Sequence, residues 1–318
     1  MRRQIIVNHV MSVDIYSYIF DAILNYFQQF AGSWVQYVAS TRPIDNADVY
    51  HYHRPQMERQ GLCKNSVVTV HFDLESYDAA TEYAMFAKQY AEAAKIVCLN
   101  SLQRDYLHQR ELTKTVVIPH GYNESVFTPK KSLKKMDGTL RLGVFSKRYT
   151  NNFKGDDYIA ELWRRLPAER FSFLFIGENR YLSQAEADFY GFSSCFYERI
   201  PYHLYNEMYH SIDALLVPSY WEGGPANLPE AAATLTPILS RRVGMAPDAI
   251  EDGINGFFIG DDIEKDCELL IRLADNIDGV WSDMVNKISR RDNYFPTWHG
   301  VVRRYEEEVY RPLTAEVE

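Results

Sequence analysis

Residues 214–241 read ALLVPSYWEGGPANLPEAAATLTPILSR. The stretch begins with a short apolar run typical of a buried strand, passes through a Gly-Gly-Pro turn, and continues as an alanine-rich helical pattern before a second apolar run. A strand, a helix and a second strand in this order predict a parallel pair of strands with a crossover helix. Glu222 and Glu230 lie eight positions apart around the turn, just past the carboxyl end of the first strand. Their presence at the mouth of a buried sheet needs a chemical reason.

The same alternation of apolar runs and helical patterns recurs along the whole chain. In the first half, strands are predicted over 4–10, 34–40, 48–53, 66–72, 95–101 and 114–121, and helices over 14–30, 81–94 and 102–110. In the second half, strands are predicted over 140–146, 171–177, 195–200, 214–219 and 237–241, and helices over 155–166, 202–211, 227–235 and 300–313. Alternation of this kind indicates parallel sheets covered by helices.

Two domains are expected from the length of 318 residues, which exceeds the size at which one core usually keeps growing. The segment TPKKSLKKMDGT (128–139) is charged and poor in apolar residues, as a linker would be. We therefore predict an acceptor-side domain over 1–130 and a donor-binding domain over 131–300, with the helix at about 300–318 packing back on the first. Both should be Rossmann-like, doubly wound α/β domains that face a central cleft, where ligands bind at strand carboxyl ends.

Composition narrows the functional classes. The net charge of −9 argues against a nucleic-acid binder, which would need a basic face. The four cysteines, Cys63, Cys98, Cys195 and Cys267, form no Cys-x-x-Cys pair, so a zinc or disulfide framework is not expected and a reducing cytoplasm fits. No apolar run reaches the length of a membrane span, and the N-terminus lacks the apolar core of a signal peptide. Any membrane contact would be peripheral, at the inner face.

The predicted helix over 14–30 has two interpretations. Its apolar residues recur at helical spacing: Ile15, Ile19, Phe20, Ile23, Leu24 and Phe27. Such a stripe is usually the core-facing side of a helix. The alternative is an exposed aromatic face of the N-terminal domain that rests on a membrane or a lipid acceptor.

A polar loop with two cations follows the predicted strand at 140–146. It reads VFSKRYTNNFKG (144–155), with Arg148 and Lys154 six positions apart before a predicted helix. Two cations beside a helix N-terminus can hold a diphosphate through charge and free backbone N–H groups. The alternative is a solvated basic loop. The Walker glycine pattern is absent, which disfavours P-loop nucleotide hydrolysis.

The glutamates around the turn suit the binding of hydroxyl groups. A carboxylate accepts hydrogen bonds from vicinal hydroxyls, so Glu222 and Glu230 could hold two separate sugars. Glycines at 223 and 224 allow the backbone to come close to a ligand. The structural alternative for Glu230 is a charge near a helix start that is favoured by the helix dipole.

Taken in order, these motifs resemble the retaining nucleotide-sugar glycosyltransferases of family 4, which have the GT-B fold. The resemblance covers about residues 66–310 and is densest over 141–260. Its marker is a Glu-x7-Glu spacing after a Pro-Ser strand end. The text from 205 to 262, which continues past the turn through a Thr-Pro strand to RVGMAPDAIEDGINGFFIGDD, follows the family order, and VVIPHGYNESVFTP (116–129) is similar to the segment that closes the family's N-terminal domain.

The resemblance implies a role for each matching position. The implied donor site consists of Arg148, Lys154, Gly223, Gly224, Pro225, Ala226, Asn227, Leu228 and Glu230, with Glu222 and His71 as the catalytic residues. Glu222 would contact the donor sugar near the reacting carbon, and Glu230 the ribose hydroxyls. Arg148 and Lys154 would neutralise the leaving diphosphate. His71 would face the sugar from the N-terminal domain, although a histidine that closes a strand is often only a core or turn residue.

The reaction implied is transfer of a sugar from a nucleoside diphosphate, UDP- or GDP-linked, to a glycan or glycolipid of the cell-surface polysaccharide or lipopolysaccharide type. Retention in this family is described as front-face attack, with the departing phosphate helping to take the acceptor proton. No cofactor is expected, and the lack of an Asp-x-Asp motif argues against a catalytic metal ion. Two features depart from the family. The loop NHVMSVDIYSY (8–18) after the first strand has no glycine, and the N-terminal domain is compactly connected.

Two other functions remain open at this stage. A sugar-nucleotide epimerase or phosphorylase could share the GT-B fold, although the former should lack Lys154 with Glu-x7-Glu, and the latter needs a pyridoxal phosphate lysine and a longer chain. A non-catalytic scaffold could keep nucleotide-sugar binding and lose acceptor chemistry with its abbreviated N-terminal half. The set of His71, Arg148, Lys154 and Glu222 argues against the scaffold.

Overall fold

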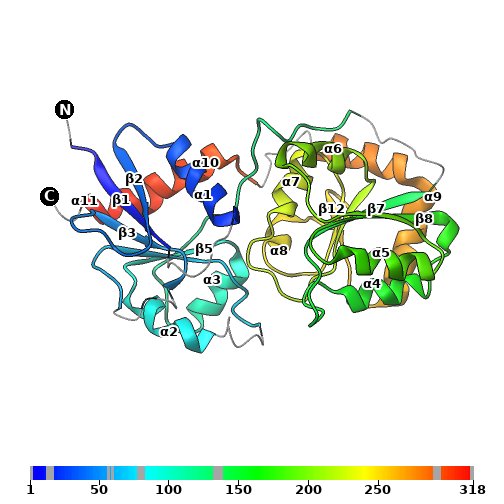
Figure 1. Ribbon diagram of the computed structural model, residues 1–318, viewed down its shortest axis with the longest axis horizontal. Coiled ribbons are helices and arrows are strands. Elements are labelled where there is room, and N and C mark those ends of the chain that lie inside the picture. The colour runs from blue at the N-terminus through cyan, green and yellow to red at the C-terminus, as the bar shows by residue number, and fades with distance from the viewer. Residues whose placement is uncertain are drawn as a thin grey trace. The chain divides into compact units, whose positions relative to one another are not determined.

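The computed structural model describes residues 3–11, 18–55, 58, 61–76, 83–131, 139–288 and 295–315 (Figure 1). The chain divides into two compact units, which we call unit 1 (Met1–Gly121 and Pro296–Glu318) and unit 2 (Tyr122–Phe295). The corresponding divisions predicted from the sequence are at 130 and about 300. Part of the predicted linker, 132–138, lies outside the described residues.

Unit 1 is built on a six-stranded parallel sheet in the order β2-β1-β3-β4-β5-β6. Its strands are β1 (Ile5–Val10), β2 (Val35–Ser40), β3 (Val49–Tyr52), β4 (Ser66–Val70), β5 (Lys95–Cys98) and β6 (Thr115–Val117). Its helices are α1 (Tyr18–Gln29), α2 (Tyr83–Glu92), α3 (Ser101–His108), α10 (Trp298–Arg304), the π-helical η4 (Tyr305–Tyr310) and α11 (Arg311–Ala315).

Helices cover both faces of this sheet, as expected for strands that read as continuous apolar runs. Phe27 of α1 and Val301 of α10 are buried in one apolar cluster with Val7 of β1. Phe86 of α2 and Val68 of β4 belong to the cluster on the opposite face. In Figure 1, α1 and α10 lie on one side of the sheet and α2 and α3 on the other. The C-terminal segment is therefore part of unit 1.

Unit 2 has a second six-stranded parallel sheet, in the order β12-β11-β10-β7-β8-β9. Its strands are β7 (Leu140–Phe145), β8 (Phe171–Ile176), β9 (Ser193–Tyr197), β10 (Ala214–Val217), β11 (Ile238–Ser240) and β12 (Gly256–Phe258). Its α-helices are α4 (Asp156–Trp163), α5 (Arg180–Phe189), α6 (Tyr205–His210), α7 (Asn227–Ala233), α8 (Ala246–Ala249) and α9 (Ile263–Ile288), with 3-10 turns η2 (Ala168–Arg170) and η3 (Tyr202–Leu204).

Each sheet contains a point at which the strand order reverses direction. In unit 2 the reversal lies between β7 and β10, and renumbering its strands from one gives the order 3-2-1-4-5-6 of the Rossmann fold. In unit 1 the reversal lies between β1 and β3. Open α/β sheets bind ligands in the crevice at the carboxyl ends of the strands beside such a reversal. These two places therefore position the candidate sites.

Two local differences from the sequence-based prediction have physical explanations. Helix α5 was missed because its inward residues are Arg180, Ser183 and Ala187, whereas Phe189 is exposed, so no apolar stripe marks it. For the predicted helix over 14–30, the described residues Phe20 and Phe27 are buried, with Ile23, in the core of unit 1. The core-facing interpretation holds for these residues, and Ile15 lies outside the described residues.

Candidate functional site

The loops after β7 and β10 meet in an ion pair at the reversal point of unit 2. Lys154 Nζ lies 2.5 Å from Glu222 Oε1, and the two side chains are 16% and 10% exposed. An ammonium group has three N–H donors. Among the contacts of the described residues, only one of these donors is used, and Glu222 Oε2 accepts no hydrogen bond. At the carboxyl edge of the sheet, Lys154 can therefore still donate hydrogen bonds to a ligand, and Glu222 can still accept them.

Two glycines, one in the loop after β7 and one in the loop after β11, allow a close approach to the loop after β10. Gly155 has a positive φ of 73°, and a side-chain Cβ at this position would lie 2.1 Å from the carbonyl oxygen of Pro218. Gly244, with a φ of 54°, packs so closely that a Cβ would lie 2.9 Å from Glu222 Cβ. A further backbone bond joins Tyr220 N to Phe153 O at 3.1 Å. Only glycine, which has no side chain, permits such a close approach. The packing of Gly244 against Glu222 was not predicted from the sequence.

Glu230 lies in α7, eight residues after Glu222, and is buried. Tyr209 OH donates a hydrogen bond to its Oε2 at 2.8 Å, and Tyr202 OH donates to Oε1 at 3.4 Å. Burial raises the pKa of Glu230 to about 7, and the two tyrosine hydrogen bonds oppose this shift. The carboxyl group is therefore held in place by phenols and titrates near neutral pH. Neither tyrosine was singled out from the sequence, because both lie far from the turn in the chain.

The segment between the two glutamates offers mainly backbone groups. Gly223 is buried, Ala226 is exposed, and Leu228 has a buried side chain and donates its N–H to Pro225 O at 3.2 Å. Pro225 has no N–H to donate.

Asn227 ties this segment to the end of β7. Its Nδ2 donates to Phe145 O at 3.2 Å, and its Oδ1 is buried and finds no partner among the described residues. A buried amide oxygen without a partner costs free energy, which a donor on a bound ligand would recover.

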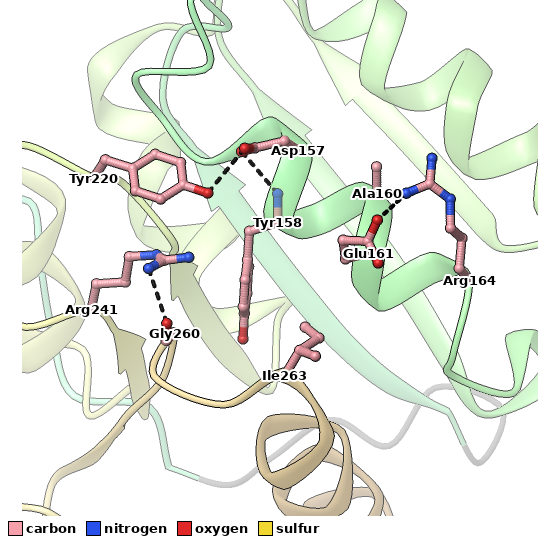
Figure 2. Close-up of a pocket in the computed structure, with 9 residues that line it drawn as sticks. All are labelled: Asp157, Tyr158, Ala160, Glu161, Arg164, Tyr220, Arg241, Gly260 and Ile263. Atoms are coloured by element: carbon pink, nitrogen blue, oxygen red, sulfur yellow. Dashed lines mark hydrogen bonds and ion pairs between the residues drawn. The ribbon is translucent and has the colours of Figure 1, made fainter.

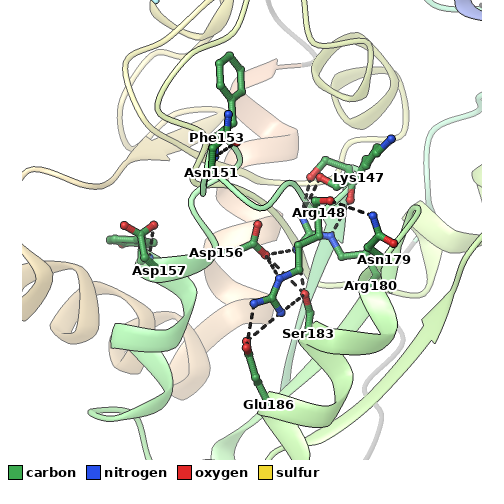
Figure 3. Close-up of polar contacts among 12 residues, drawn as sticks. Lys147, Arg148, Asn151, Phe153, Asp156, Asp157, Asn179, Arg180, Ser183 and Glu186 are labelled. Carbon is green, nitrogen blue, oxygen red and sulfur yellow. Dashed lines mark hydrogen bonds and ion pairs between the residues drawn. The ribbon is translucent and has the colours of Figure 1, made fainter. Parts of the chain in front are cut away.

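Arg148 lies in a separate ion-pair network beside α5 (Figure 3). Its guanidinium group donates to both oxygens of Glu186, at 2.9 and 2.8 Å, and Nε lies 3.9 Å from Asp156 Oδ1. Arg180, which is fully buried, also binds Asp156 and donates from Nε to Ser146 O at 2.6 Å. No described contact joins Arg148 to Lys154. The two predicted phosphate ligands thus have different partners. Lys154 pairs with Glu222 of the turn, and Arg148 pairs with Glu186 of α5.

A pocket that was not predicted from the sequence lies beside the turn that carries Glu222 (Figure 2). Its lining residues are Asp157, Tyr158, Ala160, Glu161, Arg164, Tyr220, Arg241, Gly260 and Ile263. The guanidinium carbon of Arg241 lies 4.3 Å from the ring centroid of Tyr220 and 4.9 Å from that of Tyr158, and Tyr220 OH donates to Asp157 Oδ2 at 3.0 Å. These contacts hold Tyr220, two residues before Glu222, and thereby support the turn.

His71 lies on unit 1, directly after β4, and is partly exposed. Its Nε2 lies 3.0 Å from Nδ1 of His53, and the edge of Phe20 packs against its ring with the centroids 4.8 Å apart. Burial lowers its pKa well below the usual value, so the imidazole is neutral near pH 7. A neutral imidazole at a strand end can exchange hydrogen bonds with hydroxyl groups without carrying charge.

The two parallel six-stranded sheets with flanking helices match those of GT-B glycosyltransferase structures, so the chain has the predicted GT-B fold. Residues 129–277, which lie in unit 2, match the family model described as Glycosyl transferases group 1. No curated protein sequence matches the chain.

Several solved structures are similar over nearly their whole length. The sucrose-phosphate synthase from Thermosynechococcus elongatus has a TM-score of 0.74 at 15% identity, with 99% of this chain and 100% of that chain covered. HepE from Anabaena, in complex with UDP-glucose, has a TM-score of 0.68 at 13% identity, with 96% and 99% covered. The lipopolysaccharide outer core galactosyltransferase WaaB has a TM-score of 0.61 at 15% identity, with 98% of both chains covered.

Among the helices in the described part of the chain, none combines the length and the hydropathy that a bilayer span requires.

Proposed function

We propose that the protein is a retaining glycosyltransferase that moves a sugar from a nucleoside diphosphate to a hydroxyl group of a glycan or glycolipid. The observation that carries the proposal is the Lys154–Glu222 pair at the reversal point of unit 2, with two N–H donors and one carboxylate oxygen that no contact of the described residues uses. The family match of residues 129–277 and the likeness to HepE, whose structure holds UDP-glucose, support it.

In this proposal the donor binds to unit 2. The two remaining N–H groups of Lys154 bind oxygens of the diphosphate, and Glu222 binds a hydroxyl group of the sugar that is transferred. Glu230 accepts hydrogen bonds from the ribose, and the backbone of 223–228 approaches the donor with Asn227 Oδ1 as an acceptor. Arg148 adds charge near the diphosphate. A UDP- or GDP-linked donor is expected.

The chemical step needs charge stabilisation more than a nucleophile on the protein. The acceptor oxygen forms its bond to the anomeric carbon on the face from which the diphosphate leaves, as the bond from that carbon to the phosphate oxygen breaks. The acceptor proton passes to the departing phosphate oxygen. Lys154 stabilises the negative charge that develops there, which is usually the largest single contribution of such a site. His71 is a proposed sugar contact from unit 1, and no cofactor or metal ion enters the step.

The acceptor in this proposal is of the cell-surface polysaccharide or lipopolysaccharide type, reached from the cytoplasm at the inner face of the membrane. The other functions predict different products. An epimerase would change the donor sugar without an acceptor, and a scaffold would bind without turnover.

A thermal-shift screen against UDP-, GDP-, TDP- and ADP-sugars tests donor binding, because a ligand that binds only the folded state raises the melting temperature. We expect a concentration-dependent rise with one of these nucleotide classes. With that donor, the anomeric configuration of the product, read by proton NMR, should equal that of the donor. An inverted product would exclude the retaining mechanism, and a shift without any turnover would favour the scaffold. The absence of a shift with every nucleotide would contradict the proposed donor binding.

A further inference from the structure

A line of imidazoles follows the reversal point of unit 1. His9 lies in β1 and pairs in register with His51 of β3, while His53 and His71 directly follow β3 and β4. These strands are neighbours in the sheet, so their carboxyl ends bring the four rings together.

Three of the histidines form a continuous hydrogen-bonded chain, which we call the His9–His53–His71 relay. His9 Nδ1 lies 2.8 Å from His53 Nε2, and His53 Nδ1 lies 3.0 Å from His71 Nε2. His9 and His53 are 1% and 2% exposed, whereas His71 is partly exposed. The remaining nitrogen of His71, Nδ1, makes no hydrogen bond to the described residues and is not sealed from solvent. The relay therefore leads from the core to the surface.

The relay carries no charge near neutral pH. Burial lowers the pKa of each of its three imidazoles, and that of His53 falls to about 3. The titratable neighbours act in the same direction, because His120 and the cation Arg54 disfavour a positive charge on His53 and on His71, and the relay histidines in turn lower the pKa of His51. A neutral imidazole has one N–H and one bare nitrogen. Each of the two hydrogen bonds in the relay therefore contains one proton. The remaining question is which histidine donates and which accepts in each bond.

The inner end of the relay decides this direction. His9 Nε2 is buried and has no partner among the residues that the structure describes. The rings of Phe27 and Tyr37 lie beside the imidazole, with centroids 4.7 and 5.3 Å away. An orphaned buried N–H is rarer in proteins than an orphaned acceptor. His9 should therefore keep Nε2 bare and donate from Nδ1. His53 then accepts at Nε2 and donates from its own Nδ1, and His71 accepts at Nε2.

We propose that His9 and His53 are positioning residues that lock His71 in the Nδ1–H tautomer, so that His71 offers its ligand a hydrogen-bond donor. The inference rests on the proposed function for the identity of that ligand, an oxygen of the sugar. A fixed donor cannot take a proton from the acceptor. The relay therefore agrees with a step in which the departing phosphate, and not a histidine base, receives that proton.

A metal site is the main alternative for this cluster, since ligand atoms of His9, His51 and His53 lie within 4.8 Å of one another. The hydrogen bonds of these rings argue against it. His9 Nδ1 is paired with His53 Nε2, and His53 Nδ1 with His71 Nε2, so neither nitrogen of His53 is open to an ion. Both nitrogens of His51 also have hydroxyl partners, Tyr310 at 2.8 Å and Thr69 at 2.7 Å.

Long-range proton–nitrogen NMR of the full-length protein labelled with 15N-histidine tests the relay directly, because it separates protonated from bare ring nitrogens. We expect His9, His53 and His71 all to carry the proton on Nδ1 between pH 6 and 8. His53→Phe keeps a ring at this position and removes the bridge, so His71 should gain an Nε2–H population. His9→Gln is the second variant if His53→Phe does not fold, and His108→Gln, a change at an exposed histidine of α3, is the control.

The same variants separate the relay from the proposed function. If the protein transfers sugar, His53→Phe should lower kcat roughly fivefold to tenfold, as expected for one lost hydrogen bond, with the donor KM nearly unchanged. An Nε2–H tautomer of His71 in the wild-type protein would overturn the inference even if transfer is observed. Shifts of the His9 and His53 signals on addition of Zn²⁺ would overturn it in favour of a metal site. Three Nδ1–H tautomers without any transfer would support the relay and contradict only the proposed function.

Discussion

The reversal points of the two sheets present opposite chemistry. In unit 2 the carboxyl edge holds an ion pair, Lys154 and Glu222, with hydrogen-bonding groups that the described residues leave unused, and Glu230 is buried in the helix that follows. In unit 1 the corresponding edge holds neutral imidazoles, which burial keeps uncharged. The fold is the same in both units, so the difference comes from the side chains and loops placed at the strand ends.

Under the proposed function, this difference suits the two units to two different tasks. A diphosphate carries concentrated negative charge and requires a cation that is partly shielded from water. Sugar hydroxyls are neutral and are bound well by oriented, uncharged donors and acceptors. The charged edge of unit 2 is thus suited to the leaving group, and the neutral edge of unit 1 to hydroxyl groups. Each prediction below tests one side of this comparison.

The largest effect is expected at the ion pair of unit 2. Lys154→Ala should lower kcat by about 100- to 1,000-fold, because the developing phosphate charge loses its main counter-charge. Glu222→Gln keeps the shape of the side chain and should also reduce transfer severely. Steady-state rates, with melting temperatures to confirm folding, measure both changes. Lys265→Ala, which removes a cation that is 80% exposed, is the control, and unchanged turnover in both site variants would refute the assignment.

A second test breaks the backbone contact that joins the two loops. Gly155→Ala should destabilise the protein by about 2–3 kcal/mol, because the new Cβ would have to push the chain away from Pro218 and φ is positive. Gly253 has nearly the same φ, 74°, but a Cβ added there would meet no atom within 4 Å. Gly253→Ala should therefore cost only about 1 kcal/mol. Urea unfolding measures both, and equal losses would show that backbone strain alone matters.

A third test uses the titration of Glu230. Its pKa rises from 4.5 to about 7 on folding, so the folded state binds the proton more tightly than the unfolded state. This contribution to stability is fully present below pH 4.5 and is lost as the pH rises through about 7.

Compared with Glu230→Gln, the wild-type protein should therefore lose about 2–3 kcal/mol between pH 5 and 8, measured by urea unfolding. Glu207→Gln, a change at an exposed residue of α6, is the control and should parallel the wild type. A constant difference between wild type and Glu230→Gln across this range would contradict the assigned titration.

The smallest effect is expected for Arg148, whose charge is already shared with Glu186. Arg148→Ala should raise the donor KM about fivefold, since one partly neutralised cation is lost near the diphosphate. Glu186→Gln keeps the cation and should change the KM by less than about twofold. Initial rates over a range of donor concentrations distinguish the two. If Arg148→Ala lowers the melting temperature and leaves the donor KM unchanged, Arg148 has a purely structural role.

Several features of the fold and site could be predicted from local sequence. Buried parallel strands are nearly continuous apolar runs, so β4 and β10 are evident from the sequence, and their order with the helices predicts the doubly wound units. The order of motifs along the chain indicated GT-B. The position of Lys154 and Glu222 after strands followed from the same pattern, since loops after parallel strands share one edge of the sheet.

Other features depend on contacts that leave no local signal. Helix α5 buries Arg180 against Asp156, and no apolar periodicity announces a helix whose inward face is polar. Gly244 matters because of its distance to Glu222, which lies in a different loop. The partners of Glu230 come from η3 and α6, and their effect on its pKa depends on burial.

The sequence by itself determined the alternation of elements, the GT-B class and the residue types at the strand ends, because these depend on periodicity and on neighbours in the chain. Only the tertiary structure decided which charges are paired and which histidines touch. Lys154 is 68 residues from Glu222, and His9 is 44 from His53. Pairing at such separations is set by sheet order and by the close approach of backbones, which no local pattern encodes.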